Sequence, residues 1–413
     1  MTRRRVVITG MGTVNPLSLT VAEFWRAVCD GKSGVGLIES RDTTAFKVKI
    51  GGEVKNFNPE THLDGKTARH LDRFAQFALV AAIDAVRDSG LDFAREDEYR
   101  CGVVVGSGIG GIKEFEEQHE RYVESGPRRI SPFVIPMMIP NAAAGNISIH
   151  LGLCGPNTAV STACASAAHA IADAMRTIQY DGADVMISGG TESTMTAMGL
   201  GGFISAKALS MRNDNPAAAS RPFDKDRDGF VLSEGAGILV LEELEHARKR
   251  GATIYAELLG CGSTADAFHI TAPHEDGKGA AMAMRLALKD AQLNTTDVQY
   301  LNAHGTSTQL GDLAETRAIK QVFADHARRL AISSTKSLLG HTLGASGGIE
   351  MIACIQSIRY SVVHPTINYD TPDPDCDLDY VPNKPREMRV RRAISNSFGF
   401  GGHNCSLVVG AFQ

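Results

Sequence analysis

The chain lacks several features that would place it in common functional classes. It has no C-x-x-C pair among its eight cysteines, which disfavours both a zinc ribbon and a disulfide scaffold. No run reaches the ~18 apolar residues of a membrane span, and the apolar run after Arg5 is too short for a signal peptide. The net charge of −5 argues against general nucleic-acid binding. We therefore expect a cytoplasmic protein with no membrane insertion and no nucleic-acid partner.

What the chain does contain is the material for a large α/β core. It is 43% hydrophobic, and 42 glycines separate short apolar runs from alanine-rich amphipathic ones. The patterns predict strands buried on both faces at residues 4–9, 102–105, 185–188, 237–241, 254–259, 298–303, 330–334 and 393–396. Helical spacing recurs at residues 74–89, 165–180 and 280–291. Because strand and helix patterns alternate, we expect helices covering sheets.

The chain also repeats part of its own pattern. Residues 85–91 precede a strand and a glycine turn, and the similar residues 287–293 precede another at about the same distance. The strand and helix around Cys164 likewise resemble residues 330–336 and the glycine-rich helix after them. Two such internal similarities in the same order indicate a duplicated fold. We expect two halves, residues 1–252 and 253–413.

Cys164 is the first candidate for chemistry. A short run with strand character precedes it, and helical spacing of apolar residues follows it. A cysteine where a helix begins lies among free amides and at the positive end of the helix dipole, and both favour a thiolate. The alternative is a small buried residue in an alanine-rich turn. The sequence around this residue alone does not decide between them.

Three common motifs occur in the chain, but the surrounding residues that their usual function needs are missing. The calcium-loop pattern that begins at Asp224 has Gly235 where the twelfth ligand should be, so we expect a turn held by aspartates and no metal. The glycine pattern at residues 106–111 lacks the acidic residue that dinucleotide binding needs about twenty residues later. The pattern around Ser346 has no apolar strand directly before it, so we interpret Ser346 as a packing residue.

Polar residues that could support a cysteine nucleophile follow strands of the second half. His304 lies at the end of one strand, where open α/β sheets place their sites. Lys336 and His341 follow the next. Residues 396–404 form a glycine-rich segment whose bare backbone can approach a reacting centre. Each histidine alone is more often structural, but their shared place after buried strands favours a catalytic role.

With these motifs the chain resembles the elongating β-ketoacyl-acyl carrier protein synthases of bacterial type II fatty acid synthesis. The resemblance covers essentially the whole chain. Its motifs are Thr162-Ala-Cys164, residues 302–308, residues 336–341 and residues 397–402. It implies a thiolase-like fold with two packed five-stranded sheets, a homodimer, and condensation of malonyl-carrier protein with an acyl chain.

The resemblance also implies the roles of the site residues. Cys164 would attack the acyl thioester, with the amides of Cys164 and Phe400 as the oxyanion hole. His304 and His341 would donate hydrogen bonds to the malonyl thioester carbonyl as carbon dioxide leaves. Lys336 would orient His341, with Glu350 as its buried partner. Decarboxylation drives the reaction, so no metal or redox cofactor is expected, and phosphopantetheine arrives on the carrier protein.

Further contacts carry over from the family. Thr306 and Thr308 would bind the pantetheine amides, although turn-stabilising hydroxyls are the alternative. Ile109 would line the acyl tunnel, with Phe398 and Phe400 at the substrate and Phe400 as a gate, although ordinary core residues would look the same. An acidic carrier protein should meet a basic patch. The residues that match or approximate family positions for this patch, with solvated surface charge as the alternative, are Lys66, Arg69, Arg128, Arg129 and Lys207.

Two departures from the common family pattern keep alternatives open. His403 stands where threonine is usual, so it could touch pantetheine or alter the pH dependence. The context Cys164-Ala-Ser-Ala is also a variant, and a ketosynthase of a specialised lipid or polyketide pathway is the alternative function. A coenzyme A-dependent thiolase or initiating synthase is disfavoured by His341, and a non-catalytic chain-length factor by Cys164.

Overall fold

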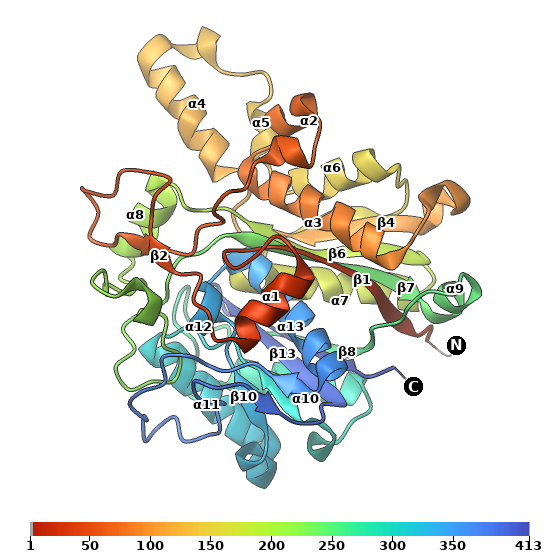
Figure 1. Cartoon of the computed structure of the whole chain (residues 1–413), viewed down its shortest axis with the longest axis vertical. Coiled ribbons are helices and arrows are strands. Elements are labelled where there is room, and N and C mark those ends of the chain that lie inside the picture. The colour runs from red at the N-terminus through yellow and green to blue at the C-terminus, as the bar shows by residue number, and fades with distance from the viewer. Residues whose placement is uncertain (1–2, 413) are drawn as a thin grey trace.

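A mixed sheet of ten strands runs through the molecule (Figure 1). The computed structural model of the chain describes residues 3–412. In chain order the ten strands are β1 (Val6–Val14), β4 (Cys101–Gly106), β5 (Asn157–Val160), β6 (Val185–Glu192), β7 (Gly235–Glu243), β8 (Ala256–Ala265), β9 (Tyr300–Asn302), β10 (Ala331–Ser333), β13 (Arg392–Gly399) and β14 (His403–Gly410). Two small ribbons pair β2 (Gly36–Leu37) with β3 (Ile50–Gly51) and β11 (Val362–Val363) with β12 (Arg386–Glu387).

The sheet consists of two copies of one five-stranded arrangement. The first copy has the order β5-β4-β6-β7-β1, and the second has the order β10-β9-β13-β14-β8. In each copy the first three strands are parallel to one another. The fourth and fifth strands each pair antiparallel with the strand before them in this order. The expected duplication is confirmed, since β4 and β9 follow the two similar segments and occupy the same place in their copies.

The two copies are joined rather than separate. β1 pairs with β8 through three residue pairs, from Val6 opposite Leu258 to Ile8 opposite Ala256. The expectation of two distinct five-stranded sheets is therefore replaced by a single ten-stranded sheet. The physical reason is that the outer strand of each copy leaves its backbone groups free, and the two free edges meet. A boundary at residue 252, between α9 and β8, stays a prediction.

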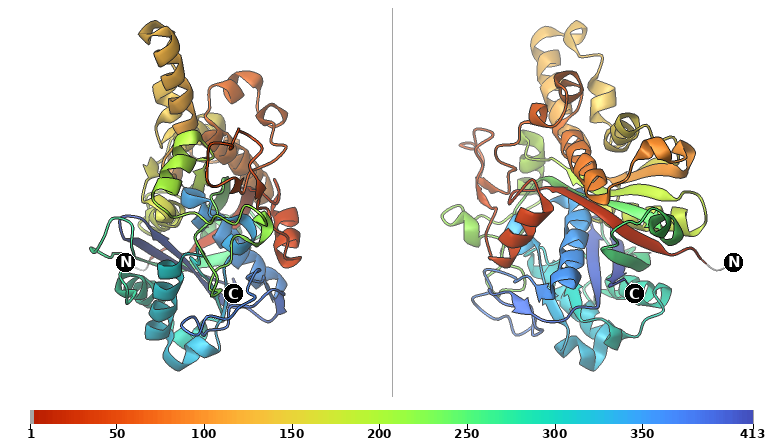
Figure 2. Two further views of the ribbon diagram at one scale, coloured as in Figure 1. Left: turned by 90° about the vertical axis from the view of Figure 1, so that its left-hand side faces the viewer. Right: turned by 45° about the vertical axis from the view of Figure 1, so that its right-hand side comes forward.

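Helices form three layers around the two halves of the sheet (Figures 1 and 2). α3 and α6 cover the outer face of the first half, and α10, with α11 against it, covers the outer face of the second. α7 and α13 lie between the halves and contact each other. The helices are α1 (Val21–Cys29), α2 (Gly65–Arg69), α3 (Arg73–Ser89), α4 (Ile112–Ser125), α5 (Val134–Met138), α6 (Ala142–Leu151), α7 (Ser166–Gln179), α8 (Ala197–Ser205), α9 (Leu244–Lys249), α10 (Lys278–Asp290), α11 (Gln309–Phe323), α12 (Lys336–Leu339) and α13 (Ser346–Tyr360).

The sequence explains why the main elements form where they do. The Asp72 side chain caps α3 by accepting the amide of Phe74, and Gly90 ends that helix in the left-handed conformation. The helix expected at residues 74–89 is thus confirmed to within one residue. The glycine-rich segment 396–404 is instead a tight hairpin, because β13 continues to Gly399 and β14 begins at His403. Within residues 3–412, no helix is long and apolar enough to cross a membrane.

The aspartate turn expected in place of a calcium loop is present. Asp224 is fully buried, and its carboxylate accepts the amides of Asp226, Asp370 and Thr371 as well as the guanidinium of Arg221. The carboxylate oxygens of Asp224 are therefore satisfied by donors of the protein itself.

Candidate active site

Cys164 lies in a short turn between the end of β5 and the start of α7. The turn is a 3-10 helix over Ala163–Ala165, and Ala163 adopts the left-handed φ of 50°, which is strained for a residue with a side chain. Gly399 of β13 packs directly against it. A Cβ on Gly399 would lie 2.6 Å from the carbonyl oxygen of Thr162 and 3.1 Å from the amide nitrogen of Cys164, so this approach requires glycine.

Burial dominates the electrostatics of the Cys164 thiol. It raises the pKa of Cys164 to about 12. The Lys336 ammonium and the backbone amides of Phe400 and Cys164 act in the opposite direction, and the Glu192 carboxylate adds to the rise. The expected help from the helix end is therefore outweighed by burial, and the resting thiol is protonated at neutral pH.

Two buried imidazoles share the cavity with Cys164. The ring centroids of His304 and His341 lie 5.4 Å apart at 85°, and Phe398 and Phe230 flank them. Burial, followed by the positive charge of Lys336, lowers the pKa of both histidines well below the ordinary value. Both rings are therefore neutral at physiological pH. A neutral imidazole presents one N–H donor, which suits it to binding a carbonyl oxygen.

Lys336 and Glu350 form a buried ion pair whose charge acts on both histidines, and this is the pairing that the family resemblance implies. Nζ of Lys336 binds Oε1 of Glu350, and each side chain is only 2% exposed. Lys336 begins α12, directly after β10, and Glu350 comes from the first turns of α13. The pair places a fixed positive charge near Cys164, His304 and His341 without exposing it to water.

A cavity of about 500 Å³ brings most of the candidate residues together. Its walls are largely apolar near Cys164, where Phe203, Phe230 and Leu343 cluster. The Thr306 and Thr308 hydroxyls, 2.9 Å apart, lie in the same lining. The sequence-derived candidates that line this cavity are Cys164, Lys207, His304, Thr306, Thr308, His341, Phe398 and Phe400.

Other candidates lie outside that lining. Ile109 is 39% exposed on the loop after β4, where its amide donates to Glu192. His403 does not line the cavity either, and its ring lies beside Gly401. Of the five basic residues, only Lys207 lines the cavity. The other four are exposed: Lys66 and Arg69 on α2, and Arg128 and Arg129 just after α4.

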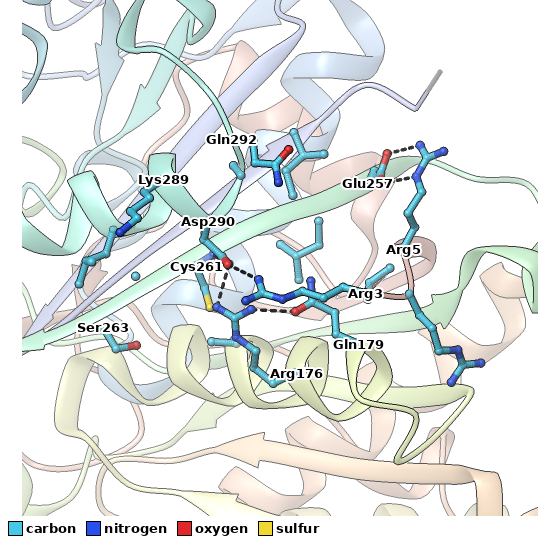
Figure 3. A pocket seen from close by; sticks show the side chains of 18 of the residues that line it. Arg3, Arg5, Arg176, Gln179, Glu257, Cys261, Ser263, Lys289, Asp290 and Gln292 are labelled. Atoms are coloured by element: carbon cyan, nitrogen blue, oxygen red, sulfur yellow. Dashed lines mark hydrogen bonds and ion pairs between the residues drawn. The ribbon is translucent and has the colours of Figure 1, made fainter. Parts of the chain in front are cut away.

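A larger hollow lies elsewhere and has a different character. It measures about 1070 Å³ and lies where β1, α7, β8 and α10 meet (Figure 3). Its charged groups bind one another. Asp290 pairs with Arg3 and Arg176, and Arg5 pairs with Glu257. Neither Cys164 nor a histidine lines it. Volume alone would therefore select the wrong site.

Two buried carboxylates support the site and were missed by sequence reasoning. Glu192, at the end of β6, accepts the amides of Gly108 and Gly344 and so ties the two halves together. Glu315 of α11 accepts the amides of His304 and Gly305. Burial raises the pKa of both carboxyls. Their sequence contexts gave no clear signal, because Glu192 lies between Thr191 and Ser193, and Glu315 lies between Ala314 and Thr316.

Comparison with known proteins places the whole chain in one family. Residues 3–247 match the model of the N-terminal domain of beta-ketoacyl synthases, and residues 255–370 match that of the C-terminal domain. The chain therefore belongs to the beta-ketoacyl synthase family, with its thiolase-like fold. It is 52% identical over 410 residues to 3-oxoacyl-[acyl-carrier-protein] synthase 2 of Staphylococcus aureus strain COL, which covers 99% of both chains. It is 50% identical over 411 residues to the protein of that name from Synechocystis, covering 100% of this chain and 99% of that one.

Solved structures agree over the full length. A type II polyketide ketosynthase, described in complex with its acyl-carrier protein, superimposes with a TM-score of 0.93 at 39% identity and covers all of both chains. A beta-ketoacyl synthase from Burkholderia phymatum gives a TM-score of 0.92 at 36% identity, covering 99% of this chain and 100% of that one.

Proposed function

We propose that this chain is a 3-oxoacyl-[acyl-carrier-protein] synthase that lengthens a fatty acyl chain by two carbons. The observation that carries the proposal is the meeting of Cys164, His304 and His341 in one cavity. The cavity is apolar beside the thiol, as an acyl chain requires. The full-length identity of 52% to a synthase of that name supports this assignment.

In the first half-reaction Cys164 accepts the acyl group. The thiol loses its proton, and its sulfur attacks the thioester carbonyl carbon of the acyl-carrier protein. The amides of Cys164 and Phe400 stabilise the oxygen that becomes negative. The carbonyl then re-forms as the bond to the pantetheine sulfur breaks, and that sulfur leaves as a thiol once it has taken up a proton. The positive charge of Lys336 favours the Cys164 thiolate through a Coulombic interaction.

In the second half-reaction the two histidines act on the malonyl group. N–H groups of His304 and His341 donate to its thioester carbonyl oxygen. The bond to the free carboxylate breaks, carbon dioxide leaves, and the electron pair remains as an enolate. The enolate carbon attacks the acyl carbonyl on Cys164, and the sulfur leaves as the 3-oxoacyl product forms. Carbon dioxide release drives the sequence, so the proposed mechanism uses no metal or redox cofactor.

The cavity wall supports recognition of a pantetheine arm. Thr306 and Thr308 offer hydroxyls in the same cavity lining as the histidines, where they would bind the amides of the arm. Phe398 and Phe400 lie on either side of Gly399 and close the cavity next to Cys164. Phe400 also faces Phe203 at 6.4 Å between ring centroids, which suits a side chain that gates the acyl group.

The carrier protein itself would dock on the basic surface around the entrance. Lys207 is exposed and lies at the cavity. Lys66, Arg69, Arg128 and Arg129 would extend the attraction for an acidic partner. The polyketide ketosynthase of similar structure is described with its acyl-carrier protein, which supports a partner of this kind. The eight cysteines are all free thiols, as suits action in the reducing cytoplasm.

A homodimer would complete the acyl site. The apolar side chains around α5 and α6 include Phe133, Ile135 and Ile149, which are 43%, 56% and 80% exposed. Ile109 is exposed in this single chain, and a second copy covering it would make it part of an acyl tunnel. Sedimentation of wild type against Ile149→Glu tests the idea. A single wild-type species of twice the chain mass that the variant loses supports it, and a monomeric wild type contradicts it.

The decisive experiment is a reconstituted condensation. Purified protein is mixed with acyl-carrier proteins of graded chain length and malonyl-carrier protein, and mass spectrometry follows both acyl-Cys164 and the 3-oxoacyl product. We expect both species in wild type and neither in Cys164→Ala. Acylation from coenzyme A thioesters but from no carrier protein would overturn the proposal.

The same assay distinguishes the second candidate, a ketosynthase of a specialised lipid or polyketide pathway. This candidate is favoured by the likeness to the polyketide ketosynthase. Product with ordinary fatty acyl chains supports elongation. The specialised pathway is supported if acyl-enzyme accumulates without product, and product forms only after a second ketosynthase-like subunit or a dedicated carrier protein is added.

A further inference from the structure

The imidazole of His341 has two hydrogen-bond partners on its Nδ1 nitrogen. Its Nδ1 lies 3.3 Å from the backbone nitrogen of Leu343 and 3.1 Å from Oγ of Ser346. Both partners are buried, and Ser346 is only 2% exposed. Ser346 is the first residue of α13, and a second hydroxyl, Oγ1 of Thr342, lies 3.0 Å from its own oxygen.

The amide of Leu343 fixes the direction of every hydrogen in this group. A backbone amide can only donate, so Nδ1 of His341 must be the acceptor and carries no proton. Ser346 therefore donates to Nδ1 as well, and its oxygen is left to accept from the hydroxyl of Thr342. The result is a chain of donors running from Thr342 through Ser346 to His341. The proton of the neutral ring is then held on Nε2, the other nitrogen of a ring that lines the cavity.

We propose that Ser346 is a positioning residue for the condensation step, which holds the ring orientation of His341 through a second hydrogen bond to Nδ1, beside the Leu343 amide that sets the Nε2–H form, with support from Thr342. This inference rests on the proposed function, in which His341 donates to the malonyl thioester. The interpretation of Ser346 as a packing residue missed this contact, because the partner atom belongs to a ring whose orientation the sequence does not show.

The other half of the molecule shows that the contact is particular to this copy. Ser166 occupies the matching position at the start of α7. Its hydroxyl binds only backbone, accepting from the amide of Thr162 at 2.9 Å and donating to the carbonyl of Ala163 at 2.6 Å. The serine of the first half thus shapes the turn that holds Cys164, whereas Ser346 contacts a side chain that reaches substrate. His304 has no comparable support, since its Nδ1 lacks a hydrogen-bond partner among residues 3–412.

The test compares the two half-reactions in Ser346→Ala, Thr342→Val and a control, Ser357→Ala. Ser357 is a buried serine of the same helix whose hydroxyl binds only the carbonyl of Ala353. We expect Ser346→Ala to slow malonyl decarboxylation about fivefold to tenfold, the worth of one hydrogen bond. Acylation of Cys164 should change less than twofold. Thr342→Val, which is isosteric, should give a smaller loss in the same step, and Ser357→Ala none.

Nitrogen NMR of histidine-labelled protein adds a readout that does not depend on turnover. The His341 signal is assigned by its loss in His341→Asn. Wild type should show a protonated Nε2 and an unprotonated Nδ1, and Ser346→Ala should move the Nδ1 signal more than Ser357→Ala does. Equal losses in both half-reactions, or an unchanged Nδ1 signal, would overturn the inference. If no condensation occurs even in wild type, the proposed function fails, while the NMR result still decides the hydrogen bond.

Discussion

Cys164 and Gly344 occupy the same position in two copies of one turn. The segments Thr162-Ala-Cys-Ala-Ser166 and Thr342-Leu-Gly-Ala-Ser346 both form a 3-10 helix that leads into a central helix, α7 or α13. In each, the second residue is left-handed, with φ of 50° at Ala163 and 46° at Leu343. One copy therefore presents a nucleophile where the other has no side chain.

The absence of a side chain at Gly344 is required by its neighbours. A Cβ there would lie 2.5 Å from the amide nitrogen of Gly108 and 2.6 Å from Oε2 of Glu192. We expect Gly344→Ala to lower the free energy of unfolding by about 3 kcal/mol or more, because backbone and a buried carboxylate must move. Gly202→Ala is the control, since its Cβ would meet nothing within 4 Å. Thermal unfolding should show a large loss in the first variant and none in the second. Equal melting temperatures would contradict the close packing.

Alkylation of Cys164 should depend steeply on pH. Burial raises the pKa of this thiol to about 12, so the reactive thiolate is a small fraction at neutral pH. The rate with iodoacetamide should rise about tenfold per pH unit between pH 7 and 9 without a plateau. Lys336→Met should react more slowly at each pH, because the positive charge no longer favours the thiolate. Peptide mass spectrometry measures the rate, with exposed Cys154 as an accessible reference. A plateau near pH 7 would show that the site lowers the pKa instead.

The ion pair between Lys336 and Glu350 should be costly to break from one side. Lys336→Met leaves a buried carboxylate without its cation, which we expect to lower stability by about 3–5 kcal/mol. Burial raises the pKa of Glu350 and Lys336 opposes that rise, so the loss should shrink at acidic pH, where the carboxyl of the variant is protonated. The double variant Lys336→Met, Glu350→Met should recover most of the stability. Urea unfolding at pH 5 and 7 checks both expectations, and a single variant as stable as wild type contradicts them.

The charged form of His246 should stabilise the protein, so the free energy of unfolding should fall at alkaline pH, where His246 loses its proton. Its hydrogen bond to Glu242, followed by that to Glu96, raises the pKa of His246 to about 9. Its stabilising contribution is therefore complete below the unfolded value of about 6.5 and is lost as the pH rises through 9. We expect His246→Gln to cost about 2 kcal/mol at pH 6 and very little at pH 10. Unfolding of both proteins across this range is the measurement. A constant difference would mean that the charge of His246 plays no part.

The sequence predicted best what local patterns determine. The helix over residues 74–89 follows from apolar spacing and the cap at Asp72, and the site residues follow from motifs at strand ends. Strand β14 was not predicted because Gly401 and Gly402 indicate a loop, whereas they form the turn of a tight hairpin between β13 and β14. The joining of β1 to β8 depends on three residue pairs more than two hundred positions apart. The contact between Ser346 and His341 depends on a ring orientation, which no spacing reveals.

The joined sheet also limits how the protein can associate through its strands. A sheet of ten strands has two edges, here β5 and β10. The edge at β10 is occupied, because the amide of Ile332 donates to the carbonyl of Asp379. β5 is the edge whose residues reach solvent, with Asn157 and Thr158 exposed. A ten-stranded sheet with one open edge can add one strand from one neighbour. Such growth ends with a pair and cannot continue into a fibre.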